Sequence, residues 1–283
     1  MGQAVRRLGH IHGLDLVMPD RSSLDLADEG SILAVLRGRP WDAVLNLAAY
    51  TAVDKAEDEA EMAFAINAVA PEILARETAR LHIPLVQVST DYVFSGDLNR
   101  PYREDDEVGP INVYGASKLS GEQAVRAHNP QHVIVRASWI VSAYRNNFVK
   151  TMLRLARDRD VIRVVNDQFG SPTSALDLAD ALLTISSRLI NGSGGSLGTF
   201  HFCNAGSGSW AEIADGVMAL SKEIGGPFAT IEPIGTADYP TRALRPKNSR
   251  LDTSHIQTHY GIKPPSWQAA FEGIVRDSVK ELA

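Results

Sequence analysis

The chain has 283 residues, of which 44% are hydrophobic and 22% charged, as in an ordinary globular protein. Its formal net charge of −6 gives no electrostatic reason to expect nucleic acid or an anionic membrane as a partner. The single cysteine, Cys203, excludes an internal disulfide. No apolar stretch reaches the roughly 18 residues of a membrane span, and no signal-peptide pattern is present, so we expect a cytoplasmic protein.

The hydrophobic pattern predicts alternating helices and strands in the first half of the chain. In chain order we expect a helix over 3–8, a strand over 14–18, a helix over 31–36, a strand over 41–47, a helix over 59–81, a strand over 83–88, a loop over 95–110, a helix that contains residues 114–118 and a strand over 132–137. The run over 83–88 is short and continuously apolar, as in a buried parallel strand. This alternation is typical of an α/β protein with a doubly wound parallel sheet.

After about residue 140 the pattern changes, and we expect a smaller lobe over 141–283. Helices are predicted over 148–157 and 175–189, a strand over 161–165 and a flexible loop over 191–196, with part of 161–190 returning to the main sheet. Four cations follow in a short stretch: Arg242, Arg245, Lys247 and Arg250. They form either a solvated loop or a docking site for a phosphorylated ligand, because guanidinium groups suit phosphate oxygens.

Three predicted strands are each followed by small or polar residues. These are the pairs Ala48-Ala49, Ser89-Thr90 and Ser138-Trp139. Ligands of doubly wound sheets bind outside the carboxyl ends of the strands. We therefore expect the three strand ends to converge on one crevice.

Tyr114 and Lys118 stand four residues apart in a predicted helix, so they share one face, with Cβ atoms about 5–6 Å apart. An ammonium beside a phenol favours the phenolate, which brings the proton exchange of the tyrosine nearer to neutral pH than its ordinary pKa of about 10. With the hydroxyl of Thr90 at a neighbouring strand end, the set can give a proton to a substrate oxygen. This equipment is typical of a carbonyl/alcohol oxidoreductase with a bound hydride carrier. An exposed pair on a solvated helix would have the same spacing, and the strand–helix context favours the catalytic interpretation.

Seven blocks of sequence carry a family resemblance. They are NLAAYTAVDKAE at 46–57, STDYVFSG at 89–96, NVYGASKL at 112–119, RASW at 136–139, NFVKTML at 147–153, NDQFGSPT at 166–173 and RPKNSRLD at 245–252. Together they resemble the dTDP-4-dehydrorhamnose reductases, which are extended short-chain dehydrogenases/reductases that act on a nucleotide sugar. The resemblance covers nearly the whole chain. It implies an NAD(P)-binding Rossmann-type region over 1–140, a mainly substrate-binding lobe over 141–283, and reduction of the C4 keto group of dTDP-4-dehydro-L-rhamnose.

The resemblance also implies residue roles. Tyr114 would protonate the C4 oxygen, Lys118 would hold the nicotinamide ribose and lower the pKa of the tyrosine, and Thr90 would polarise the carbonyl. Contacts with the cofactor are implied for Gly2, Asp25, Leu26, Ala48, Ala49, Thr51, Ser89, Tyr114 and Lys118. Asp91 and Trp139 would line the sugar pocket with Thr90. Alternatives remain open for three of these residues, with Asp91 as a turn cap, Trp139 as a core residue and Asp25 as a helix N-cap.

The sequence departs from the family at its start. A dinucleotide-binding fold of this type opens with a strand and a Gly-x-x-Gly-x-x-Gly turn, and Gly2 matches the last of these glycines only. The first strand of the family fold has no counterpart in this sequence. It would lie in the centre of the sheet, so its absence would leave a gap of about 4.8 Å toward each neighbouring strand. Either the working protein is longer than this sequence, or this is a short form with impaired cofactor binding.

We expect NADP(H) as the cofactor, with NAD(H) tolerated and no metal required. Asp20 at the end of a predicted strand favours NAD, whereas Arg21 beside it favours a 2′-phosphate. Some family members dimerise through a metal held partly by a carboxylate of the first helix, and residues 2–8 contain none, so a monomer or another homodimer is expected. Two other functions remain open: reduction of a different nucleotide sugar, and a non-catalytic role like that of the regulatory subunit of methionine adenosyltransferase.

Overall fold

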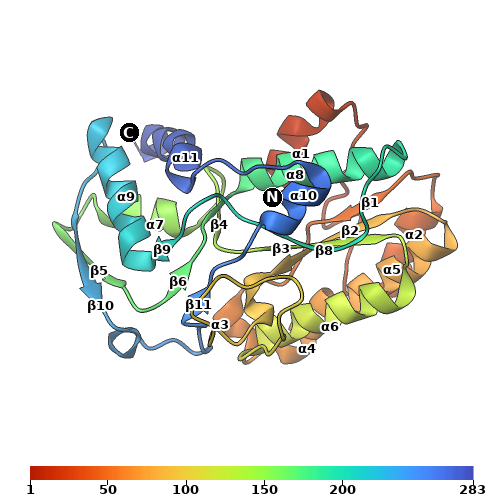
Figure 1. The fold of residues 1–283 in the computed structure, drawn as a ribbon, viewed down its shortest axis with the longest axis horizontal. Helices are drawn as coiled ribbons and strands as arrows, with labels where there is room; N and C mark the ends of the chain where they lie inside the picture. The colour runs from red at the N-terminus through yellow and green to blue at the C-terminus, as the bar shows by residue number, and fades with distance from the viewer. Residues whose placement is uncertain (283) are drawn as a thin grey trace.

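A four-stranded parallel sheet forms the larger lobe of the computed structural model, which describes residues 1–282 (Figure 1). In spatial order its strands are β1 (Val44–Asn46), β2 (Leu85–Thr90), β3 (His132–Ala137) and β8 (Gly198–Phe202). All residues of β2 are buried, and so are all of β3 except His132. This burial agrees with the continuous apolar runs in the sequence, because both faces of a parallel sheet are covered. The predicted α/β fold class is confirmed.

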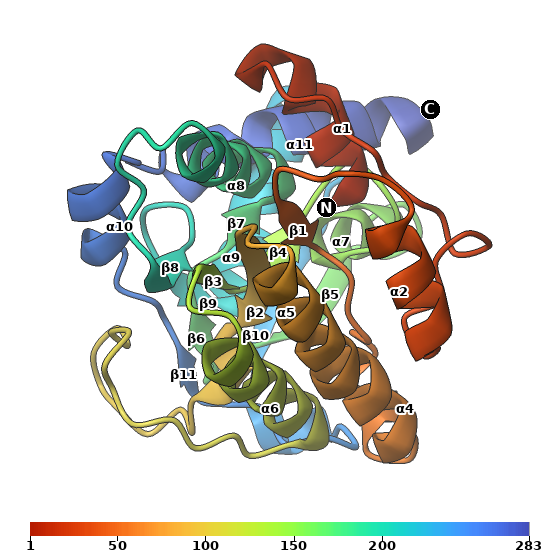
Figure 2. The same cartoon turned by 90° about the vertical axis from the view of Figure 1, so that its right-hand side faces the viewer.

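Helices cover both faces of this sheet (Figure 2). One face carries α2 (Glu29–Arg37), α5 (Ala70–Arg80) and α6 (Val113–His128), and the other α1 (Gly2–Leu8), α8 (Ala175–Ile190) and α10 (Ser254–Tyr260). On the first side Ile32, Ile73 and Ile134 belong to one apolar cluster, and on the second Leu178 and Tyr260 pack with side chains of β3. The lobe thus has three layers.

The long helix predicted over 59–81 consists of three parts. These are α4 (Ala60–Phe64), the π-helical turn η2 (Ala65–Val69) and α5, preceded by the short helix α3 (Val53–Ala56). Pro71 lies in the first turn of α5, directly after the π turn, where the regular hydrogen-bond ladder of the helix is already interrupted. Single π turns within helices are frequent at functional sites.

The smaller lobe is built around the parallel pair of β5 (Val161–Val165) and β10 (Thr230–Ile234). Its helices are α7 (Phe148–Leu155), α9 (Trp210–Glu223) and α11 (Trp267–Leu282), whose apolar faces share one core with Val149, Val217 and Phe271. Segment 161–190 was expected to return partly to the main sheet. Helix α8 does pack on that sheet, but β5 does not join it, because its backbone pairs with β10. The division of the chain near residue 140 stays a prediction.

Short strands and turns join the two lobes. The strands are β4 (Ile140–Val141) with β7 (Thr173–Ser174), and β11 (Asn248–Ser249) with β6 (Phe169–Gly170) and β9 (Gly208–Ser209). The 3-10 turns are η1 (Gly9–His12), η3 (Asp91–Val93) and η4 (Thr236–Asp238). Within residues 1–282, no helix combines the length and apolar character that crossing a bilayer requires.

The strand predicted over 14–18 is wrong, because these residues have no regular secondary structure. A strand needs a hydrogen-bonding neighbour, and in the part of the chain that the structure describes β1 pairs with β2 only, which leaves its other edge free. The sequence has no counterpart for the strand that would lie between β1 and this segment. Leu14 and Leu16 are held instead by side-chain packing near α1.

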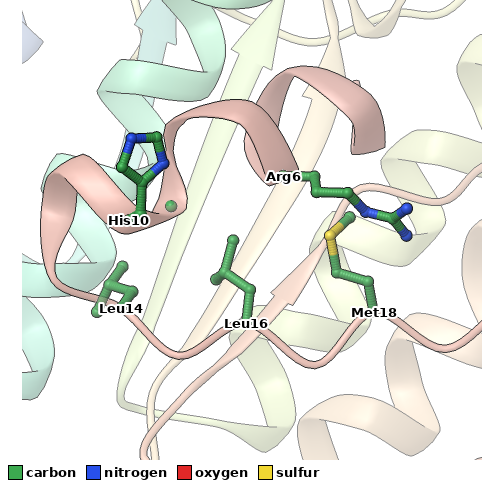
Figure 3. A pocket seen from close by; sticks show the side chains of 6 residues that line it. Arg6, His10, Leu14, Leu16 and Met18 are labelled. Atoms are coloured by element: carbon green, nitrogen blue, oxygen red, sulfur yellow. The ribbon is translucent and has the colours of Figure 1, made fainter.

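A hollow of about 400 Å³ separates this segment from α1 and η1 (Figure 3). Arg6 and Met18 lie side by side at one end, and Leu16 points from the irregular segment toward the helix. No residue of the Tyr114–Lys118 pair lines it. The hollow is therefore separate from the site described next.

Candidate active site

Helix α6 presents Tyr114 and Lys118 on one face, as the sequence predicts. Asn112 precedes the helix as its N-cap, and its Oδ1 accepts a hydrogen bond from Gly115 N at 2.8 Å. The Nδ2 of Asn112 donates to Leu244 O at 2.8 Å and so ties the start of α6 to a distant segment. The cap fixes where the helix begins and thereby which way Tyr114 points.

Thr90 and Asp91 lie where β2 ends and η3 begins. The Thr90 hydroxyl donates to Asp91 Oδ1 at 2.9 Å and accepts from Tyr92 N at 3.2 Å. The rings of Tyr92 and Tyr114 meet edge to face with centroids 5.7 Å apart, so the end of β2 lies against the start of α6. A Cβ on Gly115 would lie 2.1 Å from Tyr92 O, so only glycine permits this approach. Thr90 and Tyr114 are thus brought together.

The pKa of Tyr114 differs from the sequence expectation. Burial raises this pKa to about 12, the Asp91 carboxylate adds to the shift, and a hydrogen bond with Thr90 opposes it. The net shift is opposite to the expected lowering, because burial dominates. The Lys118 ammonium donates to Val88 O at 2.8 Å, and its effect on the tyrosine stays a prediction. Tyr114 consequently keeps its proton at neutral pH, as a general acid must.

Two further groups of the site have shifted pKa values. Burial lowers the pKa of Lys118 to about 8, against an opposing effect of Glu122 one turn farther along α6. Burial raises the pKa of Asp91 to about 7, and the hydrogen bond from Thr90 opposes the shift. The Oδ2 atom of Asp91 is buried and has no hydrogen-bond partner in residues 1–282. The N-cap of η3 is Thr90, so capping does not explain Asp91.

Trp139 follows β3 at the same edge of the sheet. Thr90 is paired in register with Ala137, two residues before Trp139, so the ends of β2 and β3 are neighbours. The indole of Trp139 is partly buried and packs against the core of the smaller lobe. It therefore lies between the sheet edge and the second lobe, and its proposed contact with substrate stays a prediction.

The expected cofactor residues fall into two groups. The loop after β1 contains Ala48, Ala49 and Thr51. Because Asn46 at the end of β1 is paired with Gln87 of β2, this loop lies beside the end of β2. The Oγ of Ser89 is buried without a hydrogen-bond partner among residues 1–282. These positions share the sheet edge with Tyr114.

Gly2, Asp25 and Leu26 lie on earlier segments, outside the strand ends. Gly2 is the first residue of α1, and Asp25 and Leu26 lie in the turn before α2. The alternative role of Asp25 as the N-cap of α2 is wrong, because Asp28 caps this helix through Gly30 N at 2.8 Å. The proposed cofactor contacts of these three residues stay predictions.

Asn67 is a site residue that the sequence reasoning missed. It lies in the π turn η2, is 1% exposed, and its amide bonds both backbone groups of Tyr50, with distances of 2.8 and 3.0 Å. Its Nδ2 also donates to Ser117 Oγ at 3.0 Å, and Ser117 Oγ donates to Tyr114 O at 2.8 Å. Asn67 thereby joins the loop after β1 to the helix of Tyr114. A polar side chain within the apolar stretch AINAV was the available signal.

Two of the four cations near residue 245 are paired with acidic groups. Arg242 forms an ion pair with Asp58, and Arg245 Nη2 lies 2.7 Å from Asp54 Oδ2. Arg245 Nη1 is buried and has no hydrogen-bond partner in the described chain. This segment is therefore not a fully solvated loop. Its role as a docking site for a phosphorylated ligand stays a prediction. Residues 1–282 contain no group of three or more His, Cys, Asp or Glu placed to hold a metal ion.

The comparison with known protein families identifies the chain. The family model of the RmlD substrate binding domain matches residues 1–280. The chain belongs to the RmlD substrate binding domain family. Among curated members of this family, the dTDP-4-dehydrorhamnose reductase of Sinorhizobium fredii is 44% identical over 93% of this chain and 89% of its own length. The Escherichia coli K12 protein of the same name is 36% identical over 97% and 92%.

Solved structures of RmlD relatives have the same fold. A dTDP-4-dehydrorhamnose reductase from Clostridium acetobutylicum is 33% identical and superposes with a TM-score of 0.90 over 97% of this chain and 94% of its own. The Bacillus anthracis reductase, solved in complex with NADP, is 34% identical with a TM-score of 0.88 over 98% and 95%. The UDP-glucose 4-epimerase of Thermus thermophilus, at 16% identity and a TM-score of 0.80, supports the Rossmann-type fold alone.

Proposed function

We propose that this protein reduces the C4 keto group of dTDP-4-dehydro-L-rhamnose to give dTDP-L-rhamnose, with NADPH preferred and NADH tolerated. The observation that carries the proposal is the placement of Thr90, Tyr114 and Lys118 at one sheet edge in a chain of the RmlD family. Relatives that bear the reductase name match almost the whole chain. The protein would act in the cytoplasm as a monomer or homodimer.

The donor groups at the sheet edge suit the nicotinamide end of such a cofactor. Lys118 Nζ donates one hydrogen bond, to Val88 O, and an ammonium has further N–H groups for ribose hydroxyls. Ser89 Oγ, which has no hydrogen-bond partner within residues 1–282, is a second polar atom in the same region. Bound there, the cofactor would supply the hydride for C4.

Two residues bear on the choice between NADP and NAD. Asp20 Oδ1 already accepts hydrogen bonds from Ser22 and Ser23, at distances of 2.6 to 3.1 Å. Arg21 beside it is exposed, and within residues 1–282 it forms no ion pair. This arrangement favours recognition of a 2′-phosphate over a ribose hydroxyl, and the NADP complex of the Bacillus anthracis relative agrees with it.

The residues of the chain then divide the proton chemistry. Tyr114 donates its phenolic proton to the C4 oxygen of the sugar. The hydroxyl of Thr90, whose one proton would turn from Asp91 Oδ1 when the sugar binds, donates a second hydrogen bond to the same oxygen. Lys118, one turn away on the same face of α6, stabilises the tyrosinate that remains. Asp91 and Trp139 hold the sugar. Arg245, whose buried Nη1 has no hydrogen-bond partner within residues 1–282, would bond a phosphate oxygen of the dTDP group once this atom is uncovered.

An assay of NADPH oxidation with dTDP-4-dehydro-L-rhamnose tests the proposal. The expected result is one dTDP-L-rhamnose formed for each NADPH consumed, and no oxidation without the sugar. Turnover only with a different nucleotide sugar would identify another reductase. Binding of NADPH without turnover of any nucleotide sugar would contradict an enzymatic role and favour a regulatory one.

A further inference from the structure

Trp139 has a backbone conformation that tryptophan rarely adopts. Its φ is +47°, in the left-handed region that favours glycine. Hydrogen bonds on both sides hold it there, since Ser138 Oγ donates to Ser171 O and Thr173 N donates to Trp139 O at 3.2 Å. The conformation is therefore imposed by segment 171–173, and it aims the side chain away from the course that a regular strand would give it.

The indole of Trp139 lies against two neighbours. It stacks on the ring of Trp210 with centroids 3.5 Å apart and planes inclined by 8°. It also passes over Gly170 so closely that an added Cβ would lie 2.3 Å from Trp139 Cε2 and 2.5 Å from Cζ2. A real Cβ does not approach other atoms this closely, so a side chain at position 170 must displace the indole or the backbone.

One short sheet places both neighbours. Gly170 in β6 pairs with Gly208 in β9, and Trp210 begins α9 directly after β9. Ser209 lies between Gly208 and Trp210 and caps α9 through a reciprocal capping box with Glu212. Ser209 is thus the one residue that connects Trp210 to the strand paired with Gly170, and its cap fixes the position of Trp210. Phe148 supports the outer side of Trp210 with ring centroids 4.6 Å apart.

We propose that Gly170 is a positioning residue that sets the place of the Trp139 indole against Trp210 and thereby the shape of the sugar pocket. Its absent side chain provides the space in which the indole lies, and no contact with substrate is assigned to it. The effect on the sugar rests on the function proposed above, whereas the effect on the indole pair does not.

Circular dichroism tests the positioning without any substrate. Two stacked indoles couple their electronic transitions and give a paired signal, which Trp210→Phe would remove and so identify. Gly170→Ala is expected to remove the same signal, because the indole must move. Gly273→Ala is the matched control, since an added Cβ on this exposed helical residue meets no atom of residues 1–282 within 4 Å. A Gly170→Ala protein that keeps the paired signal would overturn the proposal.

Steady-state kinetics test the consequence for the pocket. Gly170→Ala is expected to raise KM for the nucleotide sugar about tenfold or more with kcat changed far less, because a displaced wall removes binding and leaves Tyr114 in place. Gly273→Ala should leave both constants unchanged. Loss of the paired signal with an unchanged KM would overturn the role in the pocket. A wild-type protein that binds NADPH without reducing the sugar would contradict the proposed function alone.

A double variant covers the case in which Gly170→Ala does not fold. In a Trp139→Ala background the indole is gone, so Gly170→Ala should then leave the midpoint of thermal unfolding close to that of the Trp139→Ala protein. If Gly170→Ala destabilises the protein equally with and without the indole, the clash lies elsewhere and the proposal is wrong.

Discussion

At the scale of single residues, burial decides how the site groups titrate. Thr90 and Asp91 are buried and hydrogen-bonded to each other at the end of β2, and Tyr114 is partly buried against Tyr92 beside them. The pKa of Tyr114 is raised to about 12 and that of Asp91 to about 7. Both shifts favour the neutral form, as desolvation does for acids. Each leads to a prediction.

Tyr114→Phe removes the proposed proton donor and keeps the ring. We expect kcat to fall by about 10²- to 10⁴-fold, the usual contribution of a positioned acid, with little change in substrate binding. Measurement of kcat and of substrate affinity by calorimetry checks this. Near-normal turnover would contradict the role of the tyrosine.

Asp91→Asn is expected to change how stability depends on pH. The folded-state pKa of Asp91, about 7, lies above its ordinary value of about 4, so between these values the folded protein binds more protons than the unfolded chain. This residue therefore makes the free energy of unfolding fall as pH rises from about 4 to 7, and asparagine, which does not titrate, removes the fall.

Urea unfolding at several pH values measures the effect of Asp91→Asn. The control is Asp20→Asn, because hydrogen bonds from Ser22 and Ser23 lower the pKa of Asp20 to about 2, which gives the opposite sign. If the free energy of unfolding depends on pH in the same way for wild type and Asp91→Asn, the pKa of Asp91 is not raised in the folded protein.

At the scale of elements, α6 is joined to the sheet by a buried ion pair behind Lys118. The carboxylate of Glu122 accepts two hydrogen bonds from Arg136 of β3, at 2.9 and 2.8 Å, and both side chains are at most 2% exposed. Arg136 also faces the ring of Phe94 at 5.0 Å, so it is enclosed on several sides. The pair fixes the register of α6 against β3.

Glu122→Gln should therefore destabilise the fold strongly. Removing one partner leaves the Arg136 charge buried without its counterion, which costs about 3–5 kcal/mol. The control is Glu232→Gln, whose partner Arg163 forms an exposed pair worth about 0–1 kcal/mol. Chemical denaturation measures both variants, and equal losses would refute the buried pair's importance.

At the scale of the whole molecule, two acidic residues of the larger lobe hold the segment that leads from the smaller lobe to β11. Asp54 of α3 accepts from Ala243 N at 3.1 Å and from Arg245 at 2.7 Å. Asp58 pairs with Arg242 at the surface, where both side chains are more than half exposed. Asp54 is thus the stronger connection between the lobes.

Asp54→Ala should loosen this connection. We expect faster proteolysis around Tyr239 and Leu244, which are 59% and 68% exposed, and a several-fold higher KM for the nucleotide sugar because Arg245 loses its support. Asp58→Ala is the matched control and should change neither quantity. Identical cleavage rates in the two variants would count against the connection.

Periodicity in the sequence determined most of the elements, and motifs indicated the proposed catalytic set. The runs at β2 and β3 and the spacing of Tyr114 and Lys118 depend on local sequence, so they could be predicted residue by residue. The strand expected over 14–18 failed because a strand depends on its neighbour, and β1 offers an edge to which no described strand is joined.

Only the tertiary structure decided the rest. The raised pKa of Tyr114 comes from burial by distant segments, and the contacts of Asn67 and Gly170 join residues separated by many positions in the chain. The sequence by itself determined the fold class, the family resemblance and the residues able to move a proton. Their charge states and mutual placement depend on packing, because desolvation and steric contact act between groups that the chain brings together only when it folds.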